Sequence, residues 1–374
     1  MTMEGKDMVQ DVHISSRKDD HLRLAQQFYV HNVQALSNHD EIDAMQFVHQ
    51  ALPEMSRERV SASTSFAGIS LPRPYFINAM TGGTELTNRV NYRLARVAHD
   101  TQSALALGSM SIAVKDPRTR DAYRQLRDDF PDVRFIANLG AEHTVESAQL
   151  VQEVIGAVAL QIHLNAVQEI VMPEGEKDFT GWMNNIRAIV QESHVPVIVK
   201  EVGFGMSYET VQQLLNIGVH TVDIAGRGGT NFAQIENARN NKQDFNYMEN
   251  WGLSTIRSLI EAVEARKNQG VDAHDVSIIA SGGVRGPLDI VKYCALGADA
   301  VGLSGAFLQA ITSSDDDNEA VESTIELIHD WDEHITNIMT ILGVENLEQL
   351  RTQARYTLPE SLISYRRQRA QMWK

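Results

Sequence analysis

Three polar side chains recur at every second position of one otherwise apolar run. Gln161, His163 and Asn165 alternate with Ile162 and Leu164, and side chains two residues apart on a strand point to the same side of it. Burying such a set without a use would cost free energy. A single histidine on such a face is more often a core residue than a catalyst, but three polar residues at this spacing predict a functional site.

Gln168 and Glu169 follow this run closely in the chain. One carboxylate supplies too few ligands for a metal cage of its own, yet Mg²⁺ often takes a single protein oxygen together with substrate phosphates and water. Glu169 is therefore the candidate magnesium ligand. The pair also predicts a substrate that carries phosphate.

Lys200 comes directly after a second apolar run, residues 195–199, and Glu201 follows it. A charged side chain at the end of a buried strand needs a partner there. A flavin would supply one, because a lysine near its N1 and C2 oxygen edge stabilises the negative charge of the reduced ring. A plain salt bridge is the alternative interpretation.

Glycine-rich loops could bind the phosphate of such a cofactor. Three of them end apolar runs, at residues 226–230, 282–285 and 304–306, and the last two lie directly before helical patterns. Glycines let backbone N–H groups approach an anion closely, and a helix start adds unpaired donors and a favourable dipole. Tight turns without a ligand are the alternative interpretation of these loops.

Small or amide-bearing residues end three further apolar runs, at 80–83, 108–110 and 138–139. Such edges suit a flat heterocycle whose rim alternates donors and acceptors, with Thr81 and Asn138 as the expected contacts. Each of these edges alone is more typical of a turn. Together with the glycine loops they favour a binding site.

These runs belong to a regular alternation of strands and helices from residue 75 onward. The strands are mostly apolar, which predicts burial on both faces, and eight strand and helix units in about 240 residues fit a closed barrel better than an open sheet. The predicted fold class is therefore α/β, a TIM (β/α)8 barrel. The predicted strands are 75–79, 104–108, 133–138, 158–164, 196–201, 220–225, 276–281 and 298–303, and the clearest helices are 86–99, 148–155, 208–216, 251–266 and 287–296.

The rest of the chain divides around this barrel, with residues 1–70 as a helical N-terminal extension, 71–315 as the barrel and 316–374 as a helical tail packed on it. Of the 374 residues, 43% are hydrophobic and 22% charged, as in ordinary folded proteins. The 33 basic and 49 acidic residues give a net charge of −16, which argues against nucleic acid as a partner. A single cysteine, Cys294, and the lack of a membrane-length apolar run predict a cytoplasmic protein with no membrane partner.

In order and spacing these motifs resemble the type 2, FMN-dependent isopentenyl diphosphate isomerases. The resemblance spans almost the whole chain, and it implies interconversion of isopentenyl and dimethylallyl diphosphates with no net redox change. It further implies that FMN must be reduced, with NADPH as the reductant, that Mg²⁺ assists the diphosphate, and that the protein is a homotetramer or a larger homo-oligomer. The matching stretches are 17–21, 80–83, 108–109, 138–141, 161–169, 200–203, 223–232 and the glycine loops at 282–285 and 304–305.

The resemblance also implies a role for each matching residue. Gln168, His163 and Asn165 would serve catalysis, with Gln168 orienting or relaying a proton and the flavin as principal acid and base, while Glu169 would hold magnesium. The implied FMN contacts are Met80, Thr81, Gly82, Ser109, Asn138, Lys200, Thr230, Gly283, Val284, Arg285, Ser304 and Gly305. The implied substrate contacts are Arg17, Lys18, His21, Ser109, Met110, Ser111 and Gln168.

Two positions depart from the family pattern, since Ala225 stands where many members have a serine and Met110 where a glutamine is common. Each change removes a possible hydrogen bond, so at most a backbone contact is expected of Ala225. An FMN-dependent 2-hydroxy acid oxidase or dehydrogenase is the second interpretation, although that chemistry needs a histidine base and arginines for a substrate carboxylate. A non-catalytic flavin-binding barrel is the third, and it would have little use for the polar set at 161–169.

Overall fold

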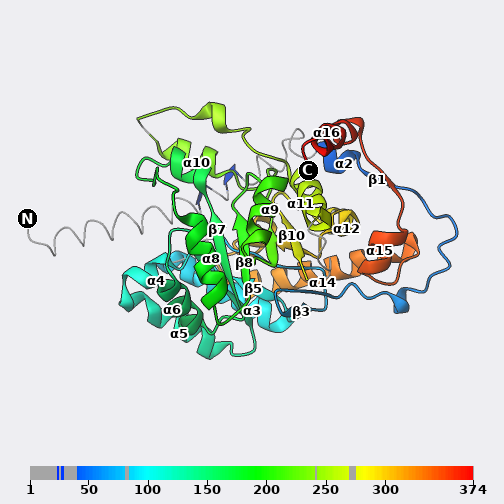
Figure 1. The fold of residues 1–374 in the computed structure, drawn as a ribbon. Helices are drawn as coiled ribbons and strands as arrows, with labels where there is room; N and C mark the ends of the chain where they lie inside the picture. The colour runs from blue at the N-terminus through cyan, green and yellow to red at the C-terminus, as the bar shows by residue number, and fades with distance from the viewer. Residues whose placement is uncertain are drawn as a thin grey trace, which may run out of the picture.

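Eight parallel strands close into a barrel at the centre of the molecule (Figure 1). The computed structural model describes residues 23–24, 27–28, 40–80, 84–240, 242–268 and 275–373. The barrel strands are β4 (Tyr75–Ile77), β5 (Ala104–Ala106), β6 (Arg134–Gly140), β7 (Ala159–Leu164), β8 (Val197–Glu201), β9 (Thr221–Asp223), β10 (Ser277–Ser281) and β11 (Ala300–Leu303). They pair in the order β10-β11-β4-β5-β6-β7-β8-β9. The predicted TIM barrel is confirmed, and the strand ends agree with the prediction to the usual one or two residues.

Helices surround the barrel, and all five that the sequence predicted most clearly are present (Figure 1). Polar side chains begin several of them, as where Thr84 and Ser207 each accept a backbone N–H three residues ahead. The helices between strands are α3 (Glu85–Thr101), α4 (Ser111–Lys115), α5 (Arg120–Asp129), α6 (Val145–Ile155), α7 (Ala166–Val171), α8 (Trp182–Glu192), α9 (Tyr208–Asn216), α10 (Phe232–Arg239), α11 (Thr255–Asn268), α12 (Pro287–Leu296) and α13 (Gly305–Ile311). The chain then continues through α14 (Asp317–Leu342), α15 (Leu347–Gln353) and α16 (Glu360–Ala370), and single 3-10 turns lie at η2 (Arg57–Arg59), η3 (Pro117–Thr119) and η4 (Asn246–Met248).

The inside of the barrel is apolar toward the amino ends of the strands. A short antiparallel hairpin, β2 (Thr64–Phe66) and β3 (Ile69–Leu71), packs its apolar side chains onto this end. The rings of Phe66 on the hairpin and Phe76 on β4 lie 4.9 Å apart between centroids. The inward-facing residues in this cluster are Phe76, Ala104, Ala106, Ile136, Ala159, Ile198, Ile279 and Ala300. The hairpin and these residues form an apolar floor under the barrel.

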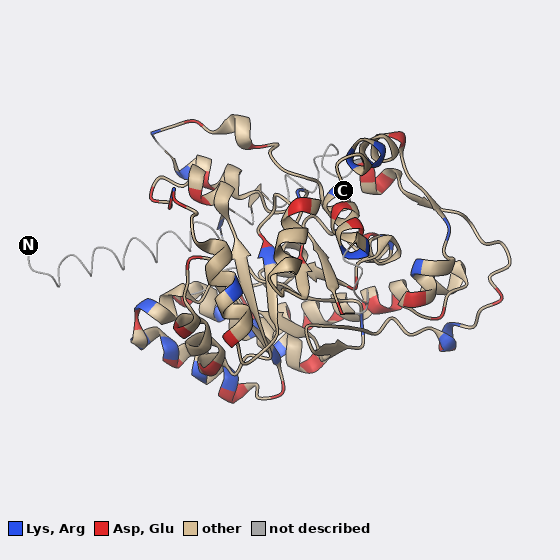
Figure 2. Ribbon diagram, in the orientation of Figure 1, with Lys and Arg blue, Asp and Glu red and all other residues tan. Residues whose placement is uncertain are grey.

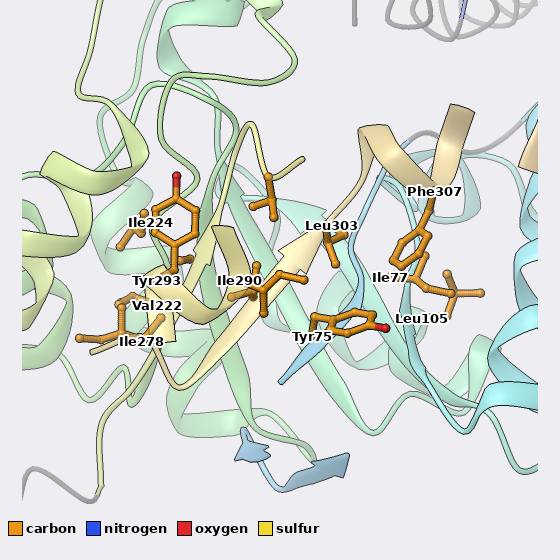
Figure 3. Packing of buried hydrophobic residues seen from close by; sticks show 14 of the residues in the cluster. Tyr75, Ile77, Leu105, Val222, Ile224, Ile278, Ile290, Tyr293, Leu303 and Phe307 are labelled. Carbon is orange, nitrogen blue, oxygen red and sulfur yellow. The ribbon is translucent and has the colours of Figure 1, made fainter. Parts of the chain in front are cut away.

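A second and larger apolar layer lies between the strands and the surrounding helices. Figure 3 shows part of it, with Ile77 and Leu105 of neighbouring strands close to Phe307 of α13. Because successive side chains alternate between this layer and the barrel interior, each strand buries both faces. That alternation is why the strands read as near-continuous apolar runs in the sequence.

The segments before and after the barrel meet each other. β1 (Gln46–Phe47) pairs with β12 (Tyr356–Thr357), and α2 (Asp40–Ala44) lies near α16 in the view of Figure 1. Charged residues lie mainly on the outer helices and loops, with few on the barrel strands (Figure 2). Among the described residues, no helix is both long enough and apolar enough to cross a bilayer. The division of the chain at residues 70 and 315 stays a prediction.

Candidate active site

The inward-facing side chains change from apolar to polar toward the carboxyl ends of the barrel strands. Asn78, Asn138, Gln161 and Asp223 lie there, each at most 3% exposed. Strand pairing sets Asn138 beside Gln161, and Lys200 beside Asp223. The carboxyl ends of the strands are where TIM barrels carry their active sites. This polar layer is therefore the base of the candidate site.

Hydrogen bonds join the polar layer into one chain across the barrel. Asn78 Nδ2 donates to Asp223 Oδ2 over 2.7 Å, and Gln161 Nε2 donates to Asn78 Oδ1 over 2.8 Å. Asn138 Nδ2 donates to Gln161 Oε1 over 2.9 Å, and Asn138 Oδ1 lies 2.8 Å from His163 Nδ1. Two residues predicted from the sequence, His163 and Asn138, are thus in direct contact. Asn78 and Asp223 were not among the predicted site residues.

Lys200 reaches the same layer from β8. Its ammonium donates to the carbonyl of Glu201 over 2.8 Å and lies 3.7 Å from Asp223 Oδ2. The other carboxylate oxygen, Asp223 Oδ1, accepts from Ser281 Oγ over 2.5 Å and from the backbone N–H of Ala225 over 3.3 Å. The salt bridge considered from the sequence is therefore present. A flavin contact by the same ammonium stays a prediction.

Glu201 holds the loop that follows β8. Its Oε2 accepts the backbone N–H groups of Gly203, Phe204 and Gly205 at 2.6, 2.5 and 3.2 Å. Burial raises the pKa of this carboxyl to about 7, although the three backbone donors act in the opposite direction. Glu201 therefore shapes the rim of the site, while its neighbour Lys200 enters the site.

The short helix α7 carries the polar residues that follow β7. Asn165 Nδ2 donates to Glu169 Oε1 over 2.8 Å, and the backbone N–H of Glu176 donates to Glu169 Oε2 over 2.8 Å. Gln168 Nε2 donates to Glu236 Oε1 over 3.0 Å. Glu236 is fully buried on α10 and was not predicted. A glutamate on a polar helix gives no sign in the sequence of what it faces.

The donor set at Glu169 fits Mg²⁺ only if phosphate oxygens and water complete the coordination. A carboxylate oxygen can accept more than one partner, so a hydrogen bond to Glu169 does not by itself exclude a metal ion there. In the described part of the chain, no group of three or more His, Cys, Asp or Glu side chains could hold a metal. The residues present therefore suit a magnesium ion that arrives with a diphosphate.

Ser109 and Ser111 lie after β5, beside a histidine that was not predicted from the sequence. Ser109 Oγ lies 2.9 Å from Ser111 Oγ, which in turn lies 2.8 Å from His143 Nε2. Burial lowers the pKa of His143, although Glu142 at 3.4 Å acts in the opposite direction. Hydroxyl and imidazole groups together can donate to phosphate oxygens. The side chain of Met110 is fully buried in the outer apolar layer, which leaves its backbone for any ligand contact.

The glycine loops after β9 and β10 meet backbone to backbone. A Cβ at Gly229 would lie 2.6 Å from the nitrogen of Gly283. Gly283 itself has a φ of +74°, and a Cβ there would lie 2.5 Å from the carbonyl carbon of Gly228. Only glycine fits so close an approach. Thr230 and Arg227 of the loop after β9 line a small recess together with Gly203 of the loop after β8.

Arg285, one of the predicted FMN contacts, is held by two carboxylates. Its guanidinium donates to Asp43 of α2 at 2.5 and 3.0 Å and to Asp289 of α12 at 2.9 and 3.0 Å. Its backbone N–H also donates to Asp289, over 3.1 Å. The structure therefore shows Arg285 joining α2 to the barrel. Its contact with a cofactor stays a prediction.

The remaining predicted residues differ in their surroundings. Ser304 Oγ donates to the carbonyl of Ala79 over 3.1 Å, which joins the loops after β11 and β4. Val284 is buried, Met80 is half-buried beside the outer apolar layer, and Gly305 begins α13. The predicted residues that lie outside the described part of the chain are Arg17, Lys18, His21, Thr81 and Gly82.

Known proteins resemble this chain in sequence and in fold. The profile of the FMN-dependent dehydrogenase family matches residues 114–357. An isopentenyl-diphosphate delta-isomerase of Staphylococcus epidermidis is 41% identical over 353 residues, which cover 94% of this chain and 96% of that protein. One of Latilactobacillus sakei is 41% identical over 338 residues, which cover 90% of this chain and 92% of that protein.

Solved structures share the barrel. The flavin-binding domain of baker's yeast flavocytochrome b2 matches with a TM-score of 0.63 at 20% sequence identity, over 89% of this chain and 80% of that chain. At such low identity the likeness shows the fold alone, because one barrel can carry many chemistries.

Proposed function

The chain belongs to the FMN-dependent dehydrogenase family and to the isopentenyl-diphosphate delta-isomerases, and from this premise we propose that it interconverts isopentenyl and dimethylallyl diphosphates with reduced FMN in the barrel mouth. The observation that carries the proposal is the 41% identity over 94% of the chain, against 20% identity to the flavocytochrome b2 domain. NADPH as reductant, Mg²⁺ on the diphosphate, a homotetrameric or larger assembly and a cytoplasmic location complete the proposal.

Moving the double bond requires a proton to be added at one carbon and another to be removed two bonds away, with positive charge at a tertiary carbon between the two steps. When bound, reduced FMN supplies an electron-rich ring that stabilises positive charge beside it and nitrogens that exchange protons. The task of the chain is then to hold the diphosphate, exclude water and orient the hydrocarbon end.

The polar layer and α7 supply groups for this task. Lys200 would place its positive charge against the flavin edge, since Asp223 already holds the ammonium at the base of the site. His163 and Asn165 would contact the substrate, and Glu169 would offer a carboxylate oxygen to Mg²⁺. Because Gln168 donates to Glu236 through Nε2, its amide oxygen Oε1 would be the acceptor that it offers to the substrate.

Proton NMR in D2O tests the proposal directly. Purified protein is incubated anaerobically with FMN, Mg²⁺, NADPH and isopentenyl diphosphate, and a parallel sample keeps the flavin oxidised. We expect dimethylallyl diphosphate that carries deuterium only where the flavin is reduced, and we expect conversion to stop when EDTA removes Mg²⁺.

The same protein is offered 2-hydroxy acids with an artificial electron acceptor. Oxidation of a hydroxy acid, without any isomerisation by flavin-loaded protein, would replace the proposal by the oxidase interpretation. FMN binding with neither reaction would favour the non-catalytic barrel.

A further inference from the structure

In the polar layer each hydrogen bond has one possible donor and one possible acceptor. This order of donors and acceptors, which begins at Asp223, determines which nitrogen of the His163 ring carries the proton. We propose that Asp223 and Asn78 are positioning residues that hold His163 in the tautomer with its proton on Nδ1. The inference rests on the proposed function in one respect, because His163 is expected to meet the substrate there.

The order of donors and acceptors begins at the carboxylate of Asp223, whose two oxygens can only accept hydrogen bonds. Asp223 is approached by the backbone N–H of Ala225, by Ser281 Oγ, by Asn78 Nδ2 and by the Lys200 ammonium. The backbone amide and the ammonium can only donate, which matches an ionised carboxylate. Asn78 must therefore turn its NH2 group toward Asp223.

The backbone fixes the same orientation of Asn78 independently. The N–H of Ala79 donates to Asn78 Oδ1 over 2.8 Å. A flipped Asn78 amide would set its oxygen against the carboxylate and its NH2 group against a backbone N–H, and both contacts would be repulsive. Asn78 Oδ1 is thus an acceptor for whatever else approaches it.

Each further amide then has a single possible orientation. Gln161 approaches Asn78 Oδ1, so it must present Nε2 there and turn Oε1 toward Asn138. Asn138 must then donate through Nδ2 and turn Oδ1 toward His163 Nδ1, 2.8 Å away. The histidine nitrogen must therefore be the donor. In the neutral ring Nδ1 carries the proton and Nε2 is the acceptor.

Burial makes this direction costly to reverse. Asn78, Gln161 and Asp223 are each 0% exposed and Asn138 is 3% exposed, so water is not at hand to satisfy a flipped amide. An unsatisfied buried donor or acceptor costs about 1–3 kcal/mol. The substrate therefore meets a histidine whose accepting nitrogen is decided before it binds.

The tautomer can be read by long-range 1H–15N NMR of the full-length, FMN-loaded protein labelled with 15N-histidine, at a pH where the ring is neutral. The resonances of His163 are those absent from a His163→Gln sample. We expect the wild-type ring to carry its proton on Nδ1. A wild-type ring protonated on Nε2 overturns the proposal without any variant.

Two variants interrupt the row of hydrogen bonds between Asp223 and His163 while leaving the contact between Asn138 and His163 in place. Asn78→Leu and Gln161→Met each free the amides beyond the cut, and we expect the Nε2–H form to become populated. Ser281→Ala is the matched control, because it removes one hydrogen bond to Asp223 without changing the direction of the chain. We expect wild-type tautomer in this control.

The cut variants are compared only where circular dichroism and the bound-FMN spectrum match the wild type. If both Asn78→Leu and Gln161→Met keep the wild-type tautomer of His163, the proposal that the hydrogen bonds set this tautomer is wrong. If only one of them folds, that variant decides the test together with the wild-type spectrum. The readout does not depend on turnover, so a failed isomerase assay with the expected tautomers would count against the proposed function alone.

Discussion

Glu201 and Lys200 are neighbours on β8 with different tasks, since one side chain holds a loop and the other enters the barrel. Glu201 gathers three backbone N–H groups while almost fully buried. A carboxyl in that position gains from its hydrogen bonds but loses hydration, and the loss is the larger effect because its pKa rises to about 7.

The raised pKa of Glu201 predicts a pH-dependent stability. In the unfolded chain this carboxyl ionises near its ordinary pKa of 4.5, and in the folded protein near 7. Between these values the folded state binds more protons, so its free energy of unfolding falls as the pH rises, by up to about 1.4 kcal/mol per pH unit.

Replacing Glu201 by Gln should remove that dependence. From about pH 5 to 7 we expect the unfolding free energy of the wild type to fall relative to that of Glu201→Gln. Above about pH 7 we expect the difference between the two to stay constant. Urea unfolding at a series of pH values measures it, and Glu192→Gln, at an exposed glutamate, is the control. A difference that is constant with pH would contradict the assignment.

Gln168 is held by Glu236, and this contact gives the residue a testable role. We expect Gln168→Ala to lower kcat roughly tenfold or more with a smaller effect on KM, because the amide orients the reacting end of the substrate. Anaerobic turnover of the reduced enzyme measures both constants. Gln149→Ala, at a half-buried glutamine on α6 outside the candidate site, is the matched control. Turnover within a few fold of wild type, with affinity unchanged, would remove Gln168 from the mechanism.

Part of the site is visible in the sequence because its residues repeat. Gln161 and His163 stand out by their period of two in an apolar run, and both belong to the hydrogen-bonded chain. Asn78 and Asp223 are single polar residues in apolar strands, which carry no such pattern. Their role depends on two residues 145 positions apart in the chain meeting inside one barrel, although their strands are not neighbours in the sheet. Contacts of that kind follow only from the closed sheet.

Among the elements, α2 is fixed to the barrel by ion pairs and hydrogen bonds as well as by the buried side chain of Ile42. Glu41 accepts from Arg257 at 2.5 to 3.1 Å, Asp43 accepts from Arg285, and the carbonyl of Ile42 accepts from the Lys292 ammonium over 2.7 Å. All three partners lie on α11, on α12 or on the loop after β10, beside the carboxyl ends of the strands. A helix of five residues is not stable alone, so these contacts hold it in place.

Neutralising both carboxylates should loosen α2 without unfolding the barrel. The double variant Glu41→Gln, Asp43→Asn removes two partly exposed ion pairs, each worth about 1 kcal/mol or less. We therefore expect the backbone amides of residues 41–45 to exchange severalfold faster, while exchange in the barrel strands is unchanged. Hydrogen exchange with mass spectrometry measures this. Asp121→Asn, which removes an exposed pair with Arg124 on α5, is the control. Equal protection of α2 in both variants would show that apolar packing alone holds it.

The strands and main helices could be predicted because each carries its own periodic signal. The hairpin of β2 and β3 was not predicted, since its strands have three residues each and no pattern can emerge over so short a length. The antiparallel pair of β1 and β12 joins residues more than 300 positions apart, which local sequence cannot indicate. The missed elements are therefore those held by their neighbours.

At the scale of the whole molecule, the barrel alone does not decide the chemistry. The flavocytochrome b2 domain has the same barrel at 20% identity, while the isomerases share 41% identity over almost the whole chain. What differs must lie in the polar layer and the loops at the carboxyl ends of the strands. Function was predictable here because several motifs in those regions occur in one order.

The apolar floor closes the barrel at its amino end, so a ligand can reach the polar layer only from the carboxyl end of the strands. Phe66, Ile69 and Leu71 of the hairpin pack against the innermost ring of side chains. Of two ligands bound one above the other, the one nearer the floor must bind first and dissociate last. The upper ligand then blocks dissociation of the lower one, and two ligands that use the same position above it must bind one after the other.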